Sequence, residues 1–245
     1  MEYPVKREIH PMPVIGIDIG GSKIRAVLWD GKRVVRARQL PTPKNKNDFQ
    51  RRLVALVSSL RRHDVEGIGI GAAGVVKRTV LVFSPNIPYI KNFDFRRVWP
   101  SLPVRLDNDA RAFARAELLR GAGRGKKRIF ALTIGTGIGR AYGRNGAIAR
   151  LKRFEYPERW EKAYQAIRAK KADTALADFL GEKLSPLIRL FRPDLVVVGG
   201  GVLSRRGFVR RTAAAFRSRR LTAKIKRARF RKNGVAVGAA LLFSD

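Results

Sequence analysis

The stretch VIGIDIGGSKIRAVLW, residues 14–29, decides the fold, because two strand-like runs are separated only by a tight glycine turn. Val14–Ile19 and Lys23–Trp29 are rich in β-branched and other apolar residues, and the three residues between them suit a hairpin. A third run of this kind, residues 33–39, follows the turn at residues 30–32. The sequence therefore predicts that the chain begins with a three-stranded meander.

Beyond the meander, strand-like and helix-like runs alternate, and the second half repeats the plan of the first with its own meander. Strands are predicted at residues 67–73, 79–83, 104–106, 128–134, 138–142, 147–151, 195–198 and 223–230. Helices are predicted from a cap at residue 47 or 48, and over residues 108–121, 158–191, 208–216 and 235–243, with Pro186 kinking or dividing the longest. This alternation is typical of an α/β fold.

The composition is unusually basic. Lys and Arg number 53 against 19 Asp and Glu, a net charge of +34, yet 45% hydrophobic residues are enough for a folded core. Residues 195–244 contain 13 Lys and Arg and no acidic residue. Three interpretations stay open: a solvated cationic face, attraction of nucleotide phosphates, and nonspecific contact with nucleic acid.

Missing residue types exclude several kinds of site. Cysteine is absent, which excludes disulfides, thiolate zinc sites, iron–sulfur clusters and cysteine nucleophiles, and two histidines, His10 and His63, cannot form a histidine-rich metal site. The longest apolar run, residues 195–203, is too short to cross a bilayer, and residues 4–11 carry charges and prolines where a signal peptide needs an apolar stretch. We expect a cytoplasmic protein without membrane contact.

The first glycine turn combines groups that suit a phosphate ligand. Asp18 ends the first strand, and Gly20, Gly21, Ser22 and Lys23 follow it. Exposed backbone amides in such a turn can hold phosphate oxygens, and the carboxylate suits a hydrated magnesium ion. Taken alone, the pattern is equally that of an ordinary hairpin turn without a ligand, which is the alternative interpretation.

A second turn stands at the equivalent place in the second half, and a third glycine cluster follows residue 198. Thr133 precedes Gly135, Thr136 and Gly137 between two strands, so the pattern is neither a P-loop nor a dinucleotide fingerprint. Gly199, Gly200 and Gly201 could let a flat ring lie against the backbone at a strand's carboxyl end, or form a plain strand-to-helix turn.

Five motifs together resemble the ROK family of sugar kinases and related repressors, within the actin, hexokinase and Hsp70 superfamily. They stand in the family's order at residues 17–23, 84–86, 108–110, 135–139 and 198–201. The resemblance implies an α/β, two-domain actin-like ATPase (ribonuclease H-like) fold with a cleft between the domains. It places residues 1–108 in the first domain, completed by the C-terminal helix 234–245, and residues 109–233 in the second.

The resemblance also implies residue roles. Asp18 would hold magnesium through water, Gly20–Lys23 and the turn at Gly135 would hold ATP phosphates, and Gly199–Gly201 would lie on the adenosine side. Asn86, Asn108 and the loop ending at Gly74 would contact the sugar, and Asp109 would be the catalytic base and a further sugar contact.

Asp109 has a physical argument of its own. At the start of a helix, the helix dipole is expected to keep its carboxylate ionised and ready to accept a proton. Asn108 and Asp109 are also ordinary residues for a helix N-terminus, which is the alternative interpretation.

The chain departs from the family after the second turn. The family's glutamate–histidine segment and its cysteine-rich zinc loop are missing, so no zinc is expected. Counting without gaps brings Glu158 to the position of the first sugar-binding glutamate, and Glu155 is a second candidate. Alternatively Glu155, Glu158 and Glu161 are solvated charges that pair with neighbouring basic residues.

The resulting expectation is an ATP- and Mg²⁺-dependent kinase acting on a hexose hydroxyl, most simply the 6-hydroxyl of glucose or a related hexose. Two alternatives stay open: a non-catalytic regulator of the same fold that binds sugar or nucleic acid, and a kinase for an amino sugar or another small alcohol. The partners expected are ATP and a sugar, with nonspecific nucleic-acid contact through the basic surface, and the chain is expected to be a homodimer or a monomer.

Overall fold

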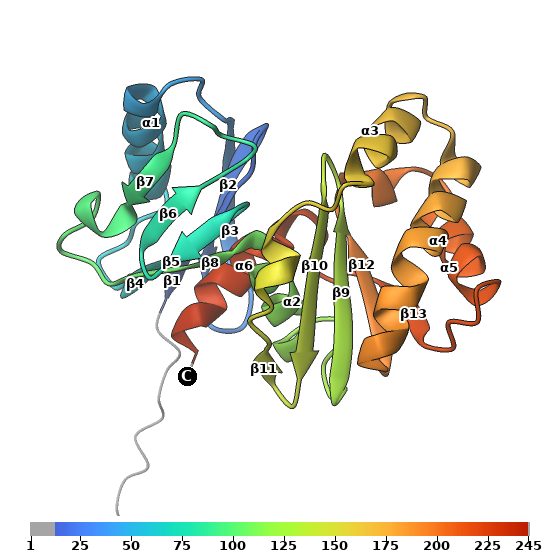
Figure 1. The fold of residues 1–245 in the computed structure, drawn as a ribbon. Coiled ribbons are helices and arrows are strands. Elements are labelled where there is room, and N and C mark those ends of the chain that lie inside the picture. The colour runs from blue at the N-terminus through green and yellow to red at the C-terminus, as the bar shows by residue number, and fades with distance from the viewer. Residues whose placement is uncertain (1–12, 245) are drawn as a thin grey trace, which may run out of the picture.

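The computed structural model describes residues 13–244, apart from the side chain of Glu155, and contains two five-stranded sheets (Figure 1). The first sheet has the order β3-β2-β1-β4-β8. Its strands are β1 (Val14–Ile19), β2 (Lys23–Trp29), β3 (Val34–Pro41), β4 (Gly67–Ala72) and β8 (Val104–Asn108). The meander β1-β2-β3 is antiparallel, and β4 and β8 extend the sheet in parallel.

The second sheet repeats this arrangement. Its order is β11-β10-β9-β12-β13, with β9-β10-β11 antiparallel and β12 and β13 parallel to β9. The strands are β9 (Arg128–Ile134), β10 (Ile138–Arg144), β11 (Ala147–Ile148), β12 (Leu195–Gly199) and β13 (Lys224–Arg227). The two predicted meanders are therefore both present, and each is followed by parallel strands.

A small third sheet was only partly predicted. It joins β5 (Val75–Lys77), β6 (Val80–Phe83) and β7 (Lys91–Asp94) in antiparallel pairs. Only β6 was expected, because β5 is three residues long and β7 has the polar sequence KNFD. Arg78, with φ of 53°, makes the tight turn between β5 and β6.

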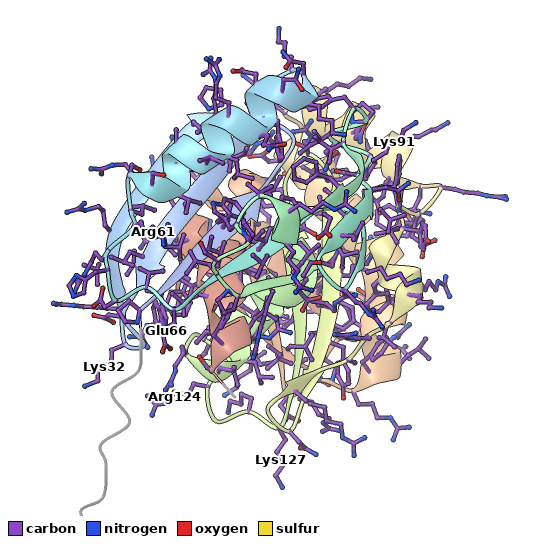
Figure 2. The ribbon with its side chains drawn as sticks, turned by 90° about the vertical axis from the view of Figure 1, so that its left-hand side faces the viewer. Lys32, Arg61, Glu66, Lys91, Arg124 and Lys127 are labelled. Atoms are coloured by element: carbon purple, nitrogen blue, oxygen red, sulfur yellow. The ribbon has the colours of Figure 1, made fainter. Side chains whose placement is uncertain are left out.

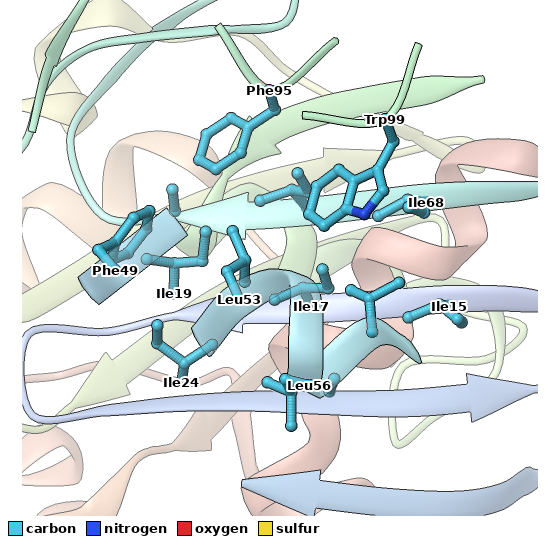
Figure 3. Close-up of a cluster of buried hydrophobic side chains, with 14 of the residues drawn as sticks. Ile15, Ile17, Ile19, Ile24, Phe49, Leu53, Leu56, Ile68, Phe95 and Trp99 are labelled. Carbon is cyan, nitrogen blue, oxygen red and sulfur yellow. The ribbon is translucent and has the colours of Figure 1, made fainter. Parts of the chain in front are cut away.

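Helix α1 (Lys46–Ser58) covers one face of the first sheet. Its cap is Asn45, whose Oδ1 accepts from the Asp48 amide at 2.9 Å, rather than residue 47 or 48. Phe49 and Leu53 are fully buried against the strands, and Figure 3 shows them beside Ile17 and Ile24. This packing fixes the first sheet's outer face, so its other face is left for the rest of the chain.

The long helix predicted over residues 158–191 is two helices, α3 (Glu161–Ala169) and α4 (Asp173–Phe191). The break lies at Lys171, which has φ of 55°, and not at Pro186, which lies inside α4. With α5 (Phe208–Arg217), α4 packs on the second sheet through Leu180, Leu184 and Phe216.

Helices α2 (Asp109–Leu119) and α6 (Gly234–Ala240) lie between the two large sheets (Figure 1). They touch backbone to backbone: a Cβ on Gly238 would lie 1.6 Å from the Ala112 carbonyl oxygen. A Cβ on Gly16 of β1 or Gly69 of β4 would lie 1.9 or 2.0 Å from a carbonyl oxygen of α6. Only glycine allows these approaches, so the C-terminal helix lies directly on the N-terminal sheet.

For the described residues, we propose the two domains expected from the sequence. The first ends near residue 108 and is completed by α6, which returns to the first sheet. Predictions for residues 1–12, including His10 and the stretch that argues against a signal peptide, lie outside the described part, as does residue 245. No helix within residues 13–244 combines the length and apolarity needed to cross a bilayer.

Gly238→Ala is expected to destabilise the protein, although alanine is normally more favourable than glycine in a helix interior. The added methyl group would overlap the Ala112 backbone, and overpacking of this kind costs about 3 kcal/mol at the upper end of its range. Urea unfolding measures the change. Gly201→Ala is the control, because its Cβ meets nothing within 4 Å; equal stability of the two variants would contradict the packing argument.

Candidate functional site

A pocket of about 660 Å³ lies where the two large sheets face each other. Asp18 at the end of β1, Asp109 at the start of α2 and Thr133 at the end of β9 line it, together with Gly199–Gly201 after β12. The remaining lining residues are Phe113, Leu203, Ser204, Arg227, Ala228, Phe230, Arg231, Lys232, Asn233 and Val235. Residues predicted from separate halves of the sequence therefore share one pocket.

Strand register explains why they meet. In the first sheet Ile19, Ala72 and Asn108 are aligned across three parallel strands, so Asp18 and Asp109 stand at the same carboxyl edge. In the second sheet Thr133 is paired with both Gly139 and Gly199. Ligands of α/β sheets bind at such edges.

The first glycine turn is held in shape from outside. The Gly20 amide donates to the Lys23 carbonyl at 3.1 Å, and the Thr42 hydroxyl donates to the Gly20 carbonyl at 2.6 Å. Gly21 lies against Asn86, because a Cβ there would come within 2.8 Å of the Asn86 Cβ. The structure thus brings a predicted sugar contact next to the predicted phosphate turn.

The second turn is held by two side chains of α3. The Tyr164 hydroxyl donates to the Gly135 carbonyl at 2.6 Å, and Glu161 Oε2 accepts from the Ile138 amide at 3.3 Å. Glu161 is only 6% exposed, and its Oε1 accepts from Arg140 Nη2 at 3.2 Å. The alternative that treated Glu161 as a solvated charge is wrong, because the buried Arg140 and the Ile138 amide both need this acceptor.

Glu158 lies near the same turn but is more exposed. Its carboxylate lies 3.5 Å from Arg140 Nη1 and 3.3 Å from Arg153 Nε, and its amide donates to Glu161 at 3.0 Å. The side chain of Glu155 lies outside the described part. Sequence reasoning missed the role of Glu161, and its only signal was its position in the first turn of a helix that follows the meander.

Two other predicted sugar contacts touch each other. Asn108 Nδ2 donates to the Gly74 carbonyl at 3.1 Å, while its Oδ1 accepts from the Ala110 amide at 3.0 Å and caps α2. Gly74 has φ of +126°, and a Cβ there would lie 2.1 Å from the Phe83 carbonyl oxygen. Asn108 therefore both caps the helix that carries Asp109 and ties it to the Gly74 loop.

Not every predicted residue lines the pocket. Within the described residues, the turn tips Gly20–Lys23 and Gly135–Gly137 lie beyond its lining, as do Gly74, Asn86, Asn108 and Glu158. The pocket instead includes Phe113, Arg231 and Lys232, which were not predicted individually. The absence of acidic residues from residues 195–244 was the signal for the two basic ones.

Burial changes the titration of both carboxylates. The pKa of Asp18 is raised to about 7, first by burial and then by the charge of Asp109, while Arg25 on the neighbouring strand acts in the opposite direction. Burial also raises the pKa of Asp109, although the Ala110 amide, which donates to it at 2.8 Å, lowers it. Desolvation is therefore the largest influence on the pKa of Asp109, and the ionised carboxylate expected from the helix dipole stays a prediction.

This pair of carboxylates fits a hydrated magnesium ion. Two mutually repelling acidic groups in a partly buried pocket are stabilised by a cation, and Mg²⁺ typically uses one or two protein carboxylates together with water and phosphate oxygens. Across residues 13–244, no cluster of three or more His, Cys, Asp or Glu side chains could hold a metal by itself. Any magnesium here would depend on phosphate ligands.

Asp18→Asn is expected to remove a pH dependence of stability in the ligand-free protein. Because the folded state raises the pKa of Asp18 from 3.8 to about 7, its contribution to stability is full below about pH 4 and is lost as the pH rises through 7. The melting temperature of the variant should therefore rise relative to wild type between pH 5 and pH 8.

Asp30→Asn is the matched control for this measurement. Hydrogen bonds from the Arg33 and Lys32 amides lower the pKa of Asp30, so its contribution does not change between pH 5 and pH 8. If the difference in melting temperature from wild type stays constant between pH 5 and pH 8 for both variants, Asp18 is not the titrating group.

Comparison with known proteins agrees with this geometry. Residues 14–153 match the profile of the ROK family. The chain is 36% identical over 133 residues to a glucokinase of Streptomyces coelicolor, which is 51% of this chain and 41% of that protein. It is 26% identical over 254 aligned positions to the N-acetylgalactosamine kinase AgaK of Shewanella sp., covering 76% of this chain and 81% of that one.

A solved ROK-family glucokinase from Streptomyces griseus, in complex with glucose and AMPPNP, superposes with a TM-score of 0.80. It is 26% identical and covers 94% of this chain and 98% of its own. This similarity confirms the predicted actin-like ATPase fold. The match to the S. coelicolor glucokinase spans only about two fifths of that protein. The family profile, however, covers more than half of this chain, including both glycine turns and Asp109, and the chain belongs to the ROK family.

Proposed function

We propose that the protein is a sugar kinase that transfers the γ-phosphoryl group of ATP to a hydroxyl of a hexose. The observation that carries this proposal is the single pocket in which Asp18, Asp109 and Thr133 meet from the carboxyl ends of two sheets. The related S. griseus structure contains glucose and AMPPNP, which supports the same pair of ligands here.

Asp109 acts as the base. The sugar hydroxyl oxygen attacks the γ-phosphorus, its proton passes to the Asp109 carboxylate, and the bond to the bridging oxygen breaks to release ADP. A raised pKa suits this role, because a base works best when its pKa lies near the working pH. Asn108 positions Asp109 through the helix cap and the Gly74 contact.

Several groups hold the nucleotide. Backbone amides at the tips of the two glycine turns donate to phosphate oxygens that extend beyond the lining of the pocket. Arg231 and Lys232 give the pocket wall a positive charge. Gly200, with φ of +98°, and its glycine neighbours let the adenosine approach the backbone. Asp18 would hold a magnesium ion through water, and the ion would supply neutralisation of the phosphate charge.

The acceptor is proposed to bind beside the pocket, near the contact between Asn108 and the Gly74 loop. Asn86 lies against the first turn at Gly21, and the Glu158 amide donates to Glu161, which holds the second turn. We propose glucose or a related hexose as the acceptor, with the 6-hydroxyl as the reacting group. Because one relative is named as an N-acetylgalactosamine kinase, amino sugars are the second class of acceptor to test by ADP release.

Asp109→Asn is expected to lower kcat by roughly 10²–10⁴-fold, since the amide cannot accept the hydroxyl proton. Binding of a fluorescent ATP analogue should remain. The measurement is coupled ADP release across hexoses and amino sugars, with wild type and variant in parallel. If the variant keeps full activity with the sugar that wild type prefers, Asp109 is not the base.

Tyr164→Phe is expected to weaken nucleotide binding while the fold is kept. The change removes the hydroxyl that holds the Gly135 carbonyl, a hydrogen bond with a net value of about 1 kcal/mol, so the dissociation constant should rise several-fold. Calorimetric titration with an ATP analogue measures it. Tyr142→Phe, on β10 of the sheet that carries the Gly135 turn, is the control and should leave the affinity for the ATP analogue unchanged. An equal loss of affinity in both variants would argue against the role of Tyr164.

A further inference from the structure

A second pocket, of about 530 Å³, lies at the opposite end of helix α2 from Asp109. Arg115 and Leu119 of α2 line it, whereas Asp109 and Phe113 of the same helix line the first pocket. The two linings share no residue. At about 1.5 Å per residue, α2 separates Asp109 from Leu119 by about 15 Å. The second pocket is therefore not part of the site proposed for phosphoryl transfer.

Elements of both proposed domains form the second pocket. The β5–β6 turn at Arg78 and Thr79 and the strand β8 belong to the first domain, together with Leu241 and Leu242 after α6. Strand β11 and the turn before it, at Gly146, belong to the second domain. Helix α2 contacts both β8 and β11. A ligand in this pocket would therefore touch both domains at once.

The second pocket is strongly basic. Its lining contains four guanidinium groups, and none of the described residues that line it is acidic. Two of the four, Arg78 and Arg150, are exposed and take part in no ion pair or side-chain hydrogen bond within residues 13–244. Arg78 belongs to the first domain and Arg150 to the second, so each domain supplies one arginine that is available to a ligand.

The other two arginines are held by neighbouring groups. Arg105 Nη1 donates to the Leu242 carbonyl oxygen, and its guanidinium lies 4.7 Å from the centre of the Phe243 ring. Arg115 Nη2 donates to Asp107 at 2.7 Å, but Arg115 Nη1 is buried and has no hydrogen-bond partner in the described structure. A buried N–H without an acceptor costs free energy, and an anion beside Arg115 would supply the acceptor.

The lining favours an ester of phosphate over a free anion. Arginine matches phosphate oxygens with its planar fork of N–H donors, and a concentration of positive charge attracts a group that carries two negative charges. Val104, Leu106, Leu119 and Ile148 add an apolar surface to the same lining. A phosphate ion has no group to place against that surface, whereas an ester has a carbon body. The volume also lies within the range usual for small-molecule sites.

We propose that the second pocket binds a small phosphate monoester. Arg78 and Arg150 bind the phosphate group, and the apolar residues contact the carbon body. Because the two arginines belong to different domains, the bound ester stabilises the arrangement of the domains described above. The proposal involves no phosphoryl transfer, and it does not depend on the proposed kinase function.

Two variants with equal loss of charge test the proposal. The pocket variant carries Arg78→Gln and Arg150→Gln, and Arg115 is kept because it is ion-paired. The control variant carries Lys32→Gln and Arg61→Gln, two exposed residues outside the pocket lining. Lys32 lies in the β2–β3 turn, at the edge of the first sheet opposite to β8, and Figure 2 labels both control residues at its left-hand side.

The first measurement is calorimetric titration with inorganic phosphate, methyl phosphate and ribose 5-phosphate at one ionic strength. Wild type and the control variant should bind ribose 5-phosphate alike, and the pocket variant should bind it about tenfold more weakly or worse, because charge-assisted contacts are lost. Equal affinity of the pocket and control variants, or no binding by wild type, overturns the proposal. If inorganic phosphate binds as tightly as the esters, the ligand is the free ion and the assignment to an ester is wrong.

The single variants Arg78→Gln and Arg150→Gln test the contact with both domains. Each should lose part of the affinity for ribose 5-phosphate, since each removes the contact from one domain. The ester should also raise the melting temperature of wild type and the control variant more than that of the pocket variant. Unchanged affinity in either single variant shows that the ester does not join the domains, and that part of the inference is then wrong.

A further variant separates the second pocket from the first. Arg231→Gln with Lys232→Gln removes two charges that line the pocket containing Asp109. Binding of ribose 5-phosphate should survive this change. If it is lost here and kept in the pocket variant, the ester binds beside Asp109 and the inference is wrong. A protein without kinase activity would contradict only the proposed function, because none of these titrations measures transfer.

Discussion

The close approach of α6 to the N-terminal sheet and to α2 is the constraint on which the site depends. Three glycines, Gly16, Gly69 and Gly238, leave room for carbonyl oxygens where any side chain would overlap them. Because α2 starts at Asp109 and packs on this layer, its position relative to Asp18 is set by backbone contact rather than by flexible side chains. Helix α6, near the C-terminal end of the chain, thereby fixes the position of Asp109 relative to Asp18.

That geometry places two acidic groups in a partly buried pocket, where they repel each other. Burial and mutual repulsion raise the pKa of Asp18 to about 7, so the ligand-free protein gains by keeping a proton there. Under the proposed function, a cation with phosphate ligands would remove the same repulsion and replace the proton. Desolvation of Asp18 near the charge of Asp109 then accounts both for the raised pKa and for the proposed affinity for a magnesium–phosphate ligand.

Local patterns predicted the elements that depend on local geometry. Both glycine turns and the strands around them follow from residue type and spacing, and so does the helix start at Asn108. The predictions failed in two places. The long helix breaks at Lys171 and not at Pro186, which lies inside α4. Glu161 is buried because Arg140, on a strand 21 residues earlier, needs its charge. No short window of sequence contains both Arg140 and Glu161.

The alternation of Lys224, Ile225 and Lys226 on β13 has a further effect on how molecules of this protein meet. β13 is the last strand of its sheet, with one side free of a partner strand in the described structure. An incoming strand of a second copy would have to desolvate these ammonium groups against a surface that carries the same sign of charge. Charge at this edge therefore keeps the sheet from growing from one molecule into the next, and favours a protein that stays dispersed at high concentration.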